Sequence, residues 1–509
     1  MAAFIKHNLK YILIIVSLVF LIYANTLHND FLSDDLPTIV NNPLISQPLG
    51  LLSIASFTNS VNYLIGGFNP FGYHLLNIIL HALNSVMVFL LLRLFFKAVP
   101  SLWGALIFAA HPAQVEAVAW VSSRLYLLFT FFLLLSFFLY LSATTNKKGD
   151  SPLRGESPFF GRYACSLILY TLALLTSFFP LAFAPLIALY DIIFGRWRKT
   201  WKLWPAFFML SAVKILLMLT IVQQRAVEIA IDSGVRSWSN PFFNLVYSFF
   251  AHLWLVIWPA KLTIYHEPSV ISSLGLKLEI FLFFLILFSL PLLYKKAKPV
   301  FFAACLYILF LCPTYSPVMI AWLVAERYLY FAMISFSIIA AFLIDRYLSG
   351  SKIKAVGYIL LAVLIGTYVL RSVIRNRDWR THSSLWKATG KISPQSPKAH
   401  NNMGDVYSLE GDWNKATAEF QRAIELKPDY AEAYHNLGNS YLNLGRIDEA
   451  ALVYQQAVAF KPSLYQSHAN LGFVYLQKGQ RELARQHLEI AARLAPDDRV
   501  VRDLLKQAQ

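Results

Sequence analysis

The sequence predicts an all-α protein in two parts, a polytopic membrane domain followed by a water-exposed solenoid of helical repeats. Three observations support this prediction. The chain of 509 residues is 57% hydrophobic and only 14% charged, a balance typical of membrane proteins. Long apolar stretches recur up to about residue 375, and the composition becomes charged and alanine-rich from about Ser396. Small residues of this last part recur at a fixed spacing.

Apolar stretches long enough to cross a bilayer, about 20 residues each, predict about 11 transmembrane helices. They cover roughly residues 9–27, 72–96, 100–120, 124–143, 162–179, 180–195, 203–222, 276–294, 299–315, 327–345 and 354–372. The stretch 241–259 is also apolar. We interpret it as a re-entrant or interfacial segment within one external loop, residues 223–275. With this interpretation, all the loops that carry basic clusters lie on the cytoplasmic side.

Basic residues lie in short clusters between the apolar stretches, which is the pattern of the positive-inside rule. The clusters are Lys147, Lys148, Arg154 and Arg162; Arg196, Arg198, Lys199 and Lys202; Lys295, Lys296 and Lys298; and Arg346, Lys352 and Lys354. This topology predicts a cytoplasmic N-terminus and an extracytoplasmic C-terminal domain. It also accounts for the net charge of +16, so we predict no nucleic-acid partner.

The C-terminal region, residues 396–509, contains a repeat of 34 residues. Four sets of residues keep this period: Gly404, Gly438 and Gly472; Gly411, Gly445 and Gly479; Ala423, Ala457 and Ala491; Pro428, Pro462 and Pro496. This period and composition indicate tetratricopeptide (TPR) repeats. We expect three repeats and a C-terminal helix to form a stack that binds a protein or peptide in its groove. The predicted domains are therefore 1–375 in the membrane, a linker at 376–395, and TPRs at 396–509.

Two adjacent acids, Asp34 and Asp35, follow the first apolar stretch in the segment NDFLSDDLPTIVNNP. The simpler interpretation is a pair of solvated loop residues. The functional interpretation is a site close to the bilayer surface, on the predicted external side.

Further polar residues lie at membrane depth, where ionisable side chains are costly and tend to line a cavity or a pathway. They form three groups: His74, Asn77 and His81; His111, Glu116 and Arg124; and Glu326, Arg327 and Tyr328. The first group shares a helix face by its spacing, which suits either a metal site or hydrogen bonds between helices. Arg327 is either an interfacial anchor or a ligand for a lipid phosphate, which the guanidinium fork suits. No ligand set matches a zinc site.

Several fragments occur in a characteristic order along the chain. They are the DD...NP loop, FGYHLLNIILHALN, HPAQVEAVAW, PLIALYD, AERYLYF, RNRDW and the trailing repeats. In this order they resemble the GT-C glycosyltransferases that carry TPR repeats, the transmembrane and TPR-repeat O-mannosyltransferases and their bacterial relatives. The resemblance covers nearly the whole chain and implies a GT-C fold in a bacterial inner membrane, with the TPR domain in the periplasm.

The resemblance implies transfer of a sugar from a polyprenyl-phosphate donor, often to a Ser or Thr hydroxyl of a protein. Asp34 would be the general base, Asp35 would support it or bind the acceptor, and one base with direct displacement implies inversion. The donor phosphate would be bound by Arg327, Arg124 and His111. The other cavity candidates are Glu116, His74, Asn77, His81, Glu326 and Tyr328. No metal ligand is assigned; the paired acids leave room for a divalent metal, which a base mechanism does not require.

The chain departs from the family pattern at Ser123, Tyr126 and Phe178, where the relatives carry charged residues. These departures bear on donor specificity and on whether catalytic activity is kept. Two other function classes compete with a glycosyltransferase. A membrane-anchored TPR scaffold for envelope assembly would explain the repeats but needs only one span. A lipid transporter would explain polar groups at membrane depth, but no internal repeat is evident in the membrane part.

Overall fold

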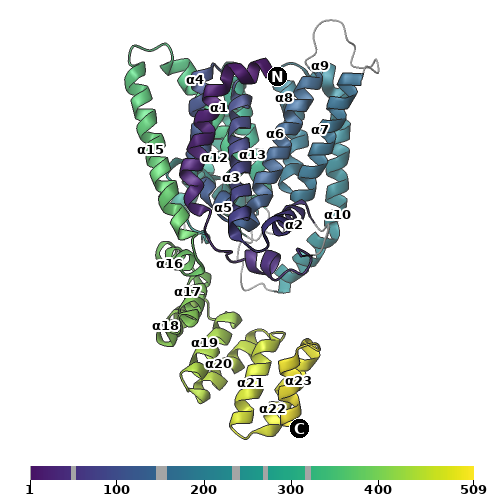
Figure 1. The fold of residues 1–509 in the computed structure, drawn as a ribbon, viewed down its shortest axis with the longest axis vertical. Helices are drawn as coiled ribbons and strands as arrows, with labels where there is room; N and C mark the ends of the chain where they lie inside the picture. The colour runs from purple at the N-terminus through teal and green to yellow at the C-terminus, as the bar shows by residue number, and fades with distance from the viewer. Residues whose placement is uncertain (1, 47–52, 145–156, 232–240, 267–272, 316–321) are drawn as a thin grey trace. The chain divides into compact units, whose positions relative to one another are not determined.

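The computed structural model describes residues 2–46, 53–144, 157–231, 241–266, 273–315 and 322–509, and the regular structure of these residues is helical (Figure 1). The chain divides into two compact units. The first contains Met1–Ile264 and Pro268–Thr381, and the second contains Tyr265–Glu267 and His382–Gln509. The predicted all-α fold class, a membrane part followed by TPR repeats, is confirmed.

In the described residues of the first unit, nine helices are long and apolar enough to cross a membrane, which makes the protein an integral membrane protein. These nine helices are His7–Thr26, Pro70–Leu92, Val121–Thr144, Phe159–Thr176, Trp197–Leu219, Leu274–Lys296, Lys298–Tyr315, Glu326–Leu348 and Lys354–Asp378. Each coincides with one of the predicted spans.

The structure differs from the sequence prediction at residues 100–120, which do not form one continuous helix. Helix α4 covers only Ala98–Ala110, and a 3-10 turn, Pro112–Gln114, separates it from the short helix α5, Val115–Ala119. Proline lacks an N–H group and disfavours a helical conformation of the preceding residue, so the helix ends at His111–Pro112.

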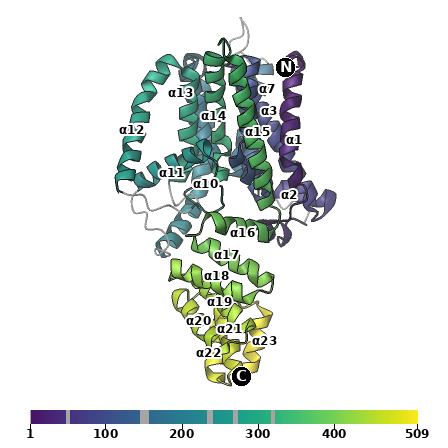
Figure 2. The same ribbon diagram turned by 90° about the vertical axis from the view of Figure 1, so that its left-hand side faces the viewer.

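The predicted span at 180–195 is likewise shorter, because it consists of a 3-10 turn, Phe179–Ala182, followed by α8, Phe183–Ile193. The apolar stretch 241–259 forms α11, Pro241–Ile257, which Figure 2 shows at a steep angle to the neighbouring α12, Ser273–Lys296. The structure therefore has nine membrane-length helices and three shorter apolar ones in its described part, where the sequence predicts about 11 spans.

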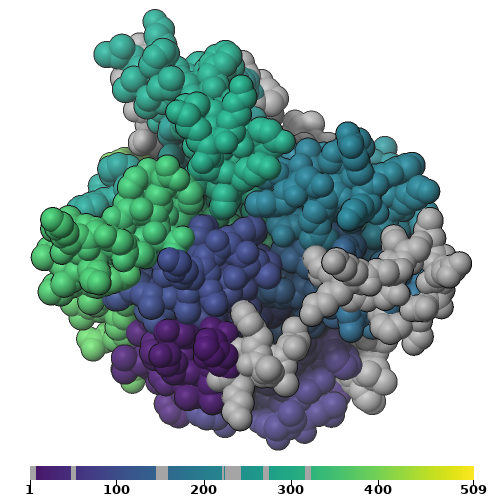
Figure 3. Space-filling view, turned by 90° about the horizontal axis from the view of Figure 1, so that it is seen from above, coloured from purple at the N-terminus to yellow at the C-terminus, as the bar shows by residue number. Residues whose placement is uncertain are grey.

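Three helices form the centre of the bundle: α3 (Pro70–Leu92), α6 (Arg124–Thr144) and α14 (Leu329–Leu343). Most of their residues are buried. Helix α12 instead exposes large apolar side chains such as Phe288, as expected of a helix that faces lipid. It projects from the rest of the bundle in Figure 3.

The candidate site residues and the basic helix α9 lie at opposite ends of the helix bundle. At one end, α5, the start of α14 and the last turn of α15 (Lys354–Asp378) meet the loop that follows α1 (Ala2–Tyr23). In this loop the Asp30 N–H donates to the Arg380 carbonyl at 2.9 Å. The basic helix α9, Trp197–Thr200, lies at the opposite end, on the side of the N-terminus (Figure 1). Lys147, Lys148 and Arg154 of the first basic cluster lie outside the described residues.

The remaining turns and helices of the first unit complete its order along the chain. They are Ala24–Thr26, Leu36–Val40, α2 Ile54–Gly66, Val121–Ser123, α7 Ser157–Thr176, Trp201–Leu203, α10 Trp204–Ile231, α13 Lys298–Leu311, Cys312–Tyr315, Glu326–Tyr328 and Ile344–Leu348.

The second unit is a stack of helix pairs. Its helices are α16 His382–Ile392, α17 Pro397–Leu409, α18 Trp413–Leu426, α19 Ala431–Asn443, α20 Ile447–Phe460, α21 Tyr465–Gln477, α22 Arg481–Leu494 and α23 Arg499–Ala508. The glycine at the centre of each first helix allows close packing: a Cβ atom on Gly438 would lie 2.5 Å from the ring of Tyr454. Helix α16 and the end of α15 occupy the residues predicted as the linker 376–395.

Candidate active site

The acidic loop presents Asp34 to solvent through a strained turn. Ser33 has a φ of +50°, and it is the one non-glycine residue with positive φ in the described chain. The Asp35 N–H donates to the Leu32 carbonyl at 2.9 Å and closes this turn. Asp34 is exposed, and the described residues provide no hydrogen-bond donor to its carboxylate. A ligand can therefore reach this carboxylate without displacing a protein partner.

Asp35 has the opposite environment, because its side chain is only 1% exposed. Its carboxylate accepts the Leu32 N–H at 3.0 Å, the Ser122 N–H at 2.7 Å and the Ser122 hydroxyl at 2.5 Å. Burial raises the pKa of Asp35 to about 6, although these hydrogen bonds and the charge of Arg124 act in the opposite direction. Asp35 thus fixes the acidic loop to the turn that precedes α6.

Arg327 lies just before α14 and is held by Glu116 of α5. The Arg327 N–H donates to Glu116 Oε2 at 3.0 Å, and the guanidinium forms an ion pair with Glu116 Oε1. The guanidinium also lies over two rings, 5.4 Å from the centroid of Trp120 and 5.0 Å from that of Tyr328. The Arg327 side chain is 10% exposed, whereas that of Glu116 is fully buried.

A second buried ion pair lies beside the first. Glu326 accepts from Arg375 of α15 at 3.5 Å, and Arg375 also donates to Asp378 at 3.0 Å. The Arg375 guanidinium lies 5.7 Å from the ring centroid of Trp379. Each buried cation therefore has an acid and an aromatic ring beside it, which offsets part of the cost of removing these charges from water.

Trp120 connects the acidic loop to the two ion pairs. Its indole N–H donates to the Leu32 carbonyl at 3.3 Å, and its ring stacks on Trp379 with a centroid distance of 5.7 Å. Trp120, Arg375 and Trp379 are not among the site residues predicted from the sequence. All three lie in fragments that carry the family resemblance, HPAQVEAVAW and RNRDW, which is the signal that could have identified them.

Arg124 makes several contacts inside the protein. Its Nε donates to Asn77 Oδ1 at 2.8 Å, one Nη donates to Asn59 Oδ1 at 2.6 Å, and the other donates to the Tyr73 carbonyl at 2.9 Å. These contacts tie α6 to α2 and α3. They favour a structural role, because three of its nitrogens already serve protein acceptors.

His111 is also bound on both ring nitrogens. Its Nδ1 accepts the Ala113 N–H at 3.2 Å, and its Nε2 lies 2.9 Å from the Val256 carbonyl of α11. Since Nδ1 accepts this N–H, the proton of the neutral ring lies on Nε2. A neutral histidine that donates from Nε2 holds α11 against the end of α4.

The predicted polar face of α3 contacts three different segments. His74 Nε2 lies 3.1 Å from the Asn29 carbonyl, and Asn77 donates to the Val118 carbonyl at 3.1 Å. His81 lies between the Tyr330 hydroxyl, at 2.7 Å, and the Ala109 carbonyl, at 3.1 Å. Within the described parts of the chain, no group of three or more His, Cys, Asp or Glu is arranged to hold a metal ion.

The comparisons with known proteins agree with this architecture. Residues 404–445 and 438–479 match the TPR repeat family, and residues 465–498 match the tetratricopeptide repeat family. The protein O-mannosyl-transferase TMTC3 of Mus musculus is 26% identical over 471 residues, which cover 80% of this chain and 50% of that protein. The protein O-mannosyl-transferase F38B6.6 of Caenorhabditis elegans is 24% identical over 444 residues, covering 80% and 61%.

The chain is a distant homologue of the TMTC O-mannosyl-transferases. It spans about half the length of the curated TMTC3 proteins of Mus musculus and Homo sapiens that it matches. Among solved structures, the Arabidopsis OM64 TPR domain is 18% identical, with 22% of this chain and 93% of that chain covered and a TM-score of 0.22. A crystal structure of MamA is 23% identical, with 28% and 86% covered and a TM-score of 0.22.

In this homologue of O-mannosyl-transferases, the structure brings one subset of the predicted site residues together. Glu116, Arg327 and Glu326 lie next to the acidic loop, connected to it through Trp120. Tyr328 lies beneath the Arg327 guanidinium. The other candidates, which are His74, Asn77, His81, Arg124 and His111, form hydrogen bonds between segments of the bundle.

Proposed function

We propose that this protein is a membrane glycosyltransferase that moves a sugar from a polyprenyl-phosphate donor to an acceptor hydroxyl, with Asp34 as the general base. One observation carries the proposal. An accessible, unpaired carboxylate and a buried, fixed cation occupy neighbouring segments that contact the same indole ring, Trp120. The homology to protein O-mannosyl-transferases supports a Ser or Thr hydroxyl as the acceptor and mannose as the first sugar to test.

The proton chemistry fits Asp34. A Ser or Thr hydroxyl is a weak nucleophile, and a carboxylate within hydrogen-bond reach can accept its proton as the oxygen attacks the anomeric carbon. The bond from that carbon to the phosphate oxygen breaks in the same step, so the configuration is inverted. Asp35 is a positioning residue in this scheme, because its three hydrogen bonds set the direction in which Asp34 points.

Arg327 suits the departing phosphate. Negative charge grows on the phosphate oxygen as the sugar leaves, and a fixed cation next to it stabilises the transition state without a further reorganisation cost. Glu116 holds the guanidinium in place. Because a guanidinium has five N–H donors and one carboxylate does not use them all, donors remain for a phosphate. His111 and Arg124 contribute by fixing α11, α2 and α3 around this position.

The remaining parts of the proposal concern sidedness and the acceptor. The acidic loop lies at the end of the bundle opposite α9 and its basic residues. By the positive-inside rule this arrangement supports a reaction on the extracytoplasmic side and a cytoplasmic N-terminus. TPR repeats bind proteins, and this second unit would bind the acceptor protein or a partner in the periplasm.

A transfer assay tests this function. Membranes containing the full-length protein receive polyprenyl-phosphate mannose with a labelled sugar, and label in protein is measured after delipidation. We expect labelling above that of membranes without the protein, and a loss of about 10²-fold or more in Arg327→Gln. Arg371→Gln is the matched control, because Arg371 is a partly exposed arginine whose guanidinium donates to the Ala260 carbonyl. Equal labelling by wild type and Arg327→Gln would contradict the assignment.

A further inference from the structure

A short basic and aromatic segment joins α8 to α10 at the end of the bundle opposite the acidic loop (Figure 1). It consists of α9 and the 3-10 turn Trp201–Leu203. Three of its side chains are exposed cations, those of Arg198, Lys199 and Lys202, and no described acidic residue forms an ion pair with them. Because charged side chains avoid the hydrocarbon core, this segment lies at the membrane surface.

Two tryptophans lie among these cations. Trp197 and Trp201 are four residues apart, so they share one side of the segment, and they are 45% and 50% exposed. The Arg198 guanidinium lies 5.5 Å from the ring centroid of Trp197, and the Lys202 ammonium lies 5.7 Å from that of Trp201. Tryptophan favours the headgroup level of a bilayer. The segment therefore presents rings and cations together at the depth of lipid headgroups.

Asp191, the last residue of the PLIALYD fragment, holds both ends of this segment. Its buried carboxylate lies 3.4 Å from Arg196 Nε, just before α9, and accepts the indole N–H of Trp204, the first residue of α10, at 3.1 Å. The Tyr140 hydroxyl of α6 donates to the same carboxylate. Arg196 is thus the cation of this cluster that the protein uses for its own structure, and the three exposed cations remain available to a ligand.

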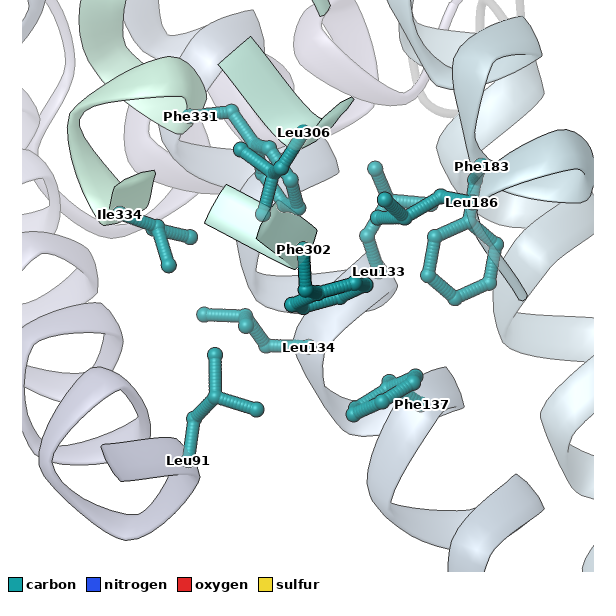
Figure 4. Close-up of a pocket in the computed structure, with 10 residues that line it drawn as sticks. All are labelled: Leu91, Leu133, Leu134, Phe137, Phe183, Leu186, Phe302, Leu306, Phe331 and Ile334. Carbon is teal, nitrogen blue, oxygen red and sulfur yellow. The ribbon is translucent and has the colours of Figure 1, made fainter. Parts of the chain in front are cut away.

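Helix α8, which carries Asp191, is itself fixed in the core of the bundle. Its Phe183 and Leu186 lie close to Phe137 of α6 and Phe302 of α13 (Figure 4). The space left among these side chains is about 20 Å³, room for about one water molecule, so it gives α8 little freedom to shift. The backbone that carries the exposed cations is therefore held in place before a ligand binds, which lowers the entropic cost of binding.

We propose that this segment binds the headgroup of an anionic phospholipid, with the phosphate among Arg198, Lys199 and Lys202. The charges are complementary, and a zwitterionic headgroup would bring its own cation next to these three. The exposed apolar side chains of Ile192 in α8 and Phe208 in α10 flank the segment and suit the acyl chains of the same lipid. This site is separate from the proposed reaction, because it lies at the other end of the bundle.

A lipid titration tests this site without requiring sugar transfer. The full-length protein, purified in detergent, is titrated with phosphatidylglycerol and with phosphatidylcholine of the same acyl chains, and native mass spectrometry measures the bound fraction. Arg198→Gln combined with Lys202→Gln removes the two cations beside the tryptophan rings. Lys352→Gln combined with Lys354→Gln is the matched control, because it removes two exposed lysines of another basic cluster for which the described residues provide no ring contact. Lys199→Gln, a single exposed substitution, guards against a folding defect of the double variant.

We expect the wild type and the control to bind phosphatidylglycerol at least tenfold more tightly than phosphatidylcholine. One cation near an anionic headgroup contributes about fivefold in affinity. Lys199→Gln should therefore weaken phosphatidylglycerol binding about fivefold and the double variant about 25-fold, with an unchanged affinity for phosphatidylcholine and an unchanged thermal transition.

Three results would overturn the proposal. The first is unchanged phosphatidylglycerol binding in Lys199→Gln and in the folded double variant, which would leave the segment to an acidic partner protein. The second is an equal loss of binding in the control, which would show that the attraction is a general effect of basic loops. The third is equal affinity of the wild type for the two lipids.

Discussion

The guanidinium of Arg327 lies 5.4 Å from the ring centroid of Trp120, and the indole N–H of Trp120 donates to the Leu32 carbonyl at 3.3 Å. Leu32 also closes the turn that presents Asp34. The Trp120 side chain thereby links the buried Arg327 guanidinium to the loop that carries the exposed Asp34 carboxylate, although Arg327 and Asp34 are far apart in the sequence. Any movement of the indole would change both the phosphate side and the acceptor side of the proposed site.

Trp120→Phe tests this link, because phenylalanine keeps an aromatic ring under Arg327 and removes the N–H donor. We expect sugar transfer to fall about tenfold and stability to fall by about 1 kcal/mol for the lost buried hydrogen bond, with a further loss because phenylalanine fills less of the space that the indole fills against Trp379. The measurement is kcat and KM in the transfer assay. Trp103→Phe is the control, because Trp103 stacks on Tyr358 of α15 and has no contact with the acidic loop. Equal losses in both variants would show that the link is not specific.

Glu116→Gln should destabilise the folded protein, because it leaves the Arg327 charge buried without its acid. Removal of one partner of a buried ion pair costs about 3–5 kcal/mol. Thermal unfolding in detergent should therefore show a clear decrease, and Glu116→Gln combined with Arg327→Gln should recover part of it. Glu482→Gln breaks an exposed pair with Arg485 and should change stability by less than about 0.5 kcal/mol. A Glu116→Gln variant as stable as the wild type would rule out this role of the pair.

Asp35 should make stability depend on pH. Its pKa in the folded protein, about 6, lies above the ordinary value of 3.8, so the folded state retains a proton that the unfolded chain releases between these values. The contribution of Asp35 to stability is fully present below pH 3.8 and is lost as the pH rises through 6. The shift corresponds to at most about 3 kcal/mol. Thermal unfolding from pH 4 to pH 7 should show a weaker decrease in Asp35→Asn than in the wild type; parallel curves would refute the assignment.

Gly438→Ala should destabilise the TPR unit by about 1–3 kcal/mol, because the new Cβ would lie 2.5 Å from the Tyr454 ring. Urea denaturation followed by tyrosine fluorescence measures the change. Gly366→Ala is the contrast. Gly366 lies inside α15 with no atom within 4 Å of the added carbon, so this substitution should be neutral or stabilising by up to about 1 kcal/mol. A Gly438→Ala variant with unchanged stability would show that the repeat tolerates wider helix spacing than the structure has.

Local and periodic features of the fold could be predicted from the sequence. The 34-residue period of Gly404, Gly438 and Gly472 identified the repeats because each glycine meets a bulky residue of its own repeat. Hydropathy located the membrane-length helices because the average over a window depends only on residues that are neighbours in the sequence. It missed the break at His111–Pro112, because averaging over a window conceals a single proline.

The contacts of the site could not be predicted in the same way. Asp35 is bound by Ser122, which is 87 residues away, and the Arg327 guanidinium pairs with Glu116 at a separation of 211 residues. Such pairs depend on how the helices pack, which a single sequence does not specify. The sequence therefore suggested two adjacent acids with related roles, whereas the fold buries Asp35 and exposes Asp34.

The most direct test of the account compares Asp34→Asn with Asp30→Asn in the transfer assay, with binding of the donor measured in parallel. Both residues are exposed acids of the same loop, and neither substitution removes an apolar contact. We predict that Asp34→Asn binds the lipid-phosphate sugar as the wild type does but transfers it about 10²–10⁴-fold more slowly, whereas Asp30→Asn keeps both properties. Wild-type transfer by Asp34→Asn would contradict the assignment of Asp34 as the general base.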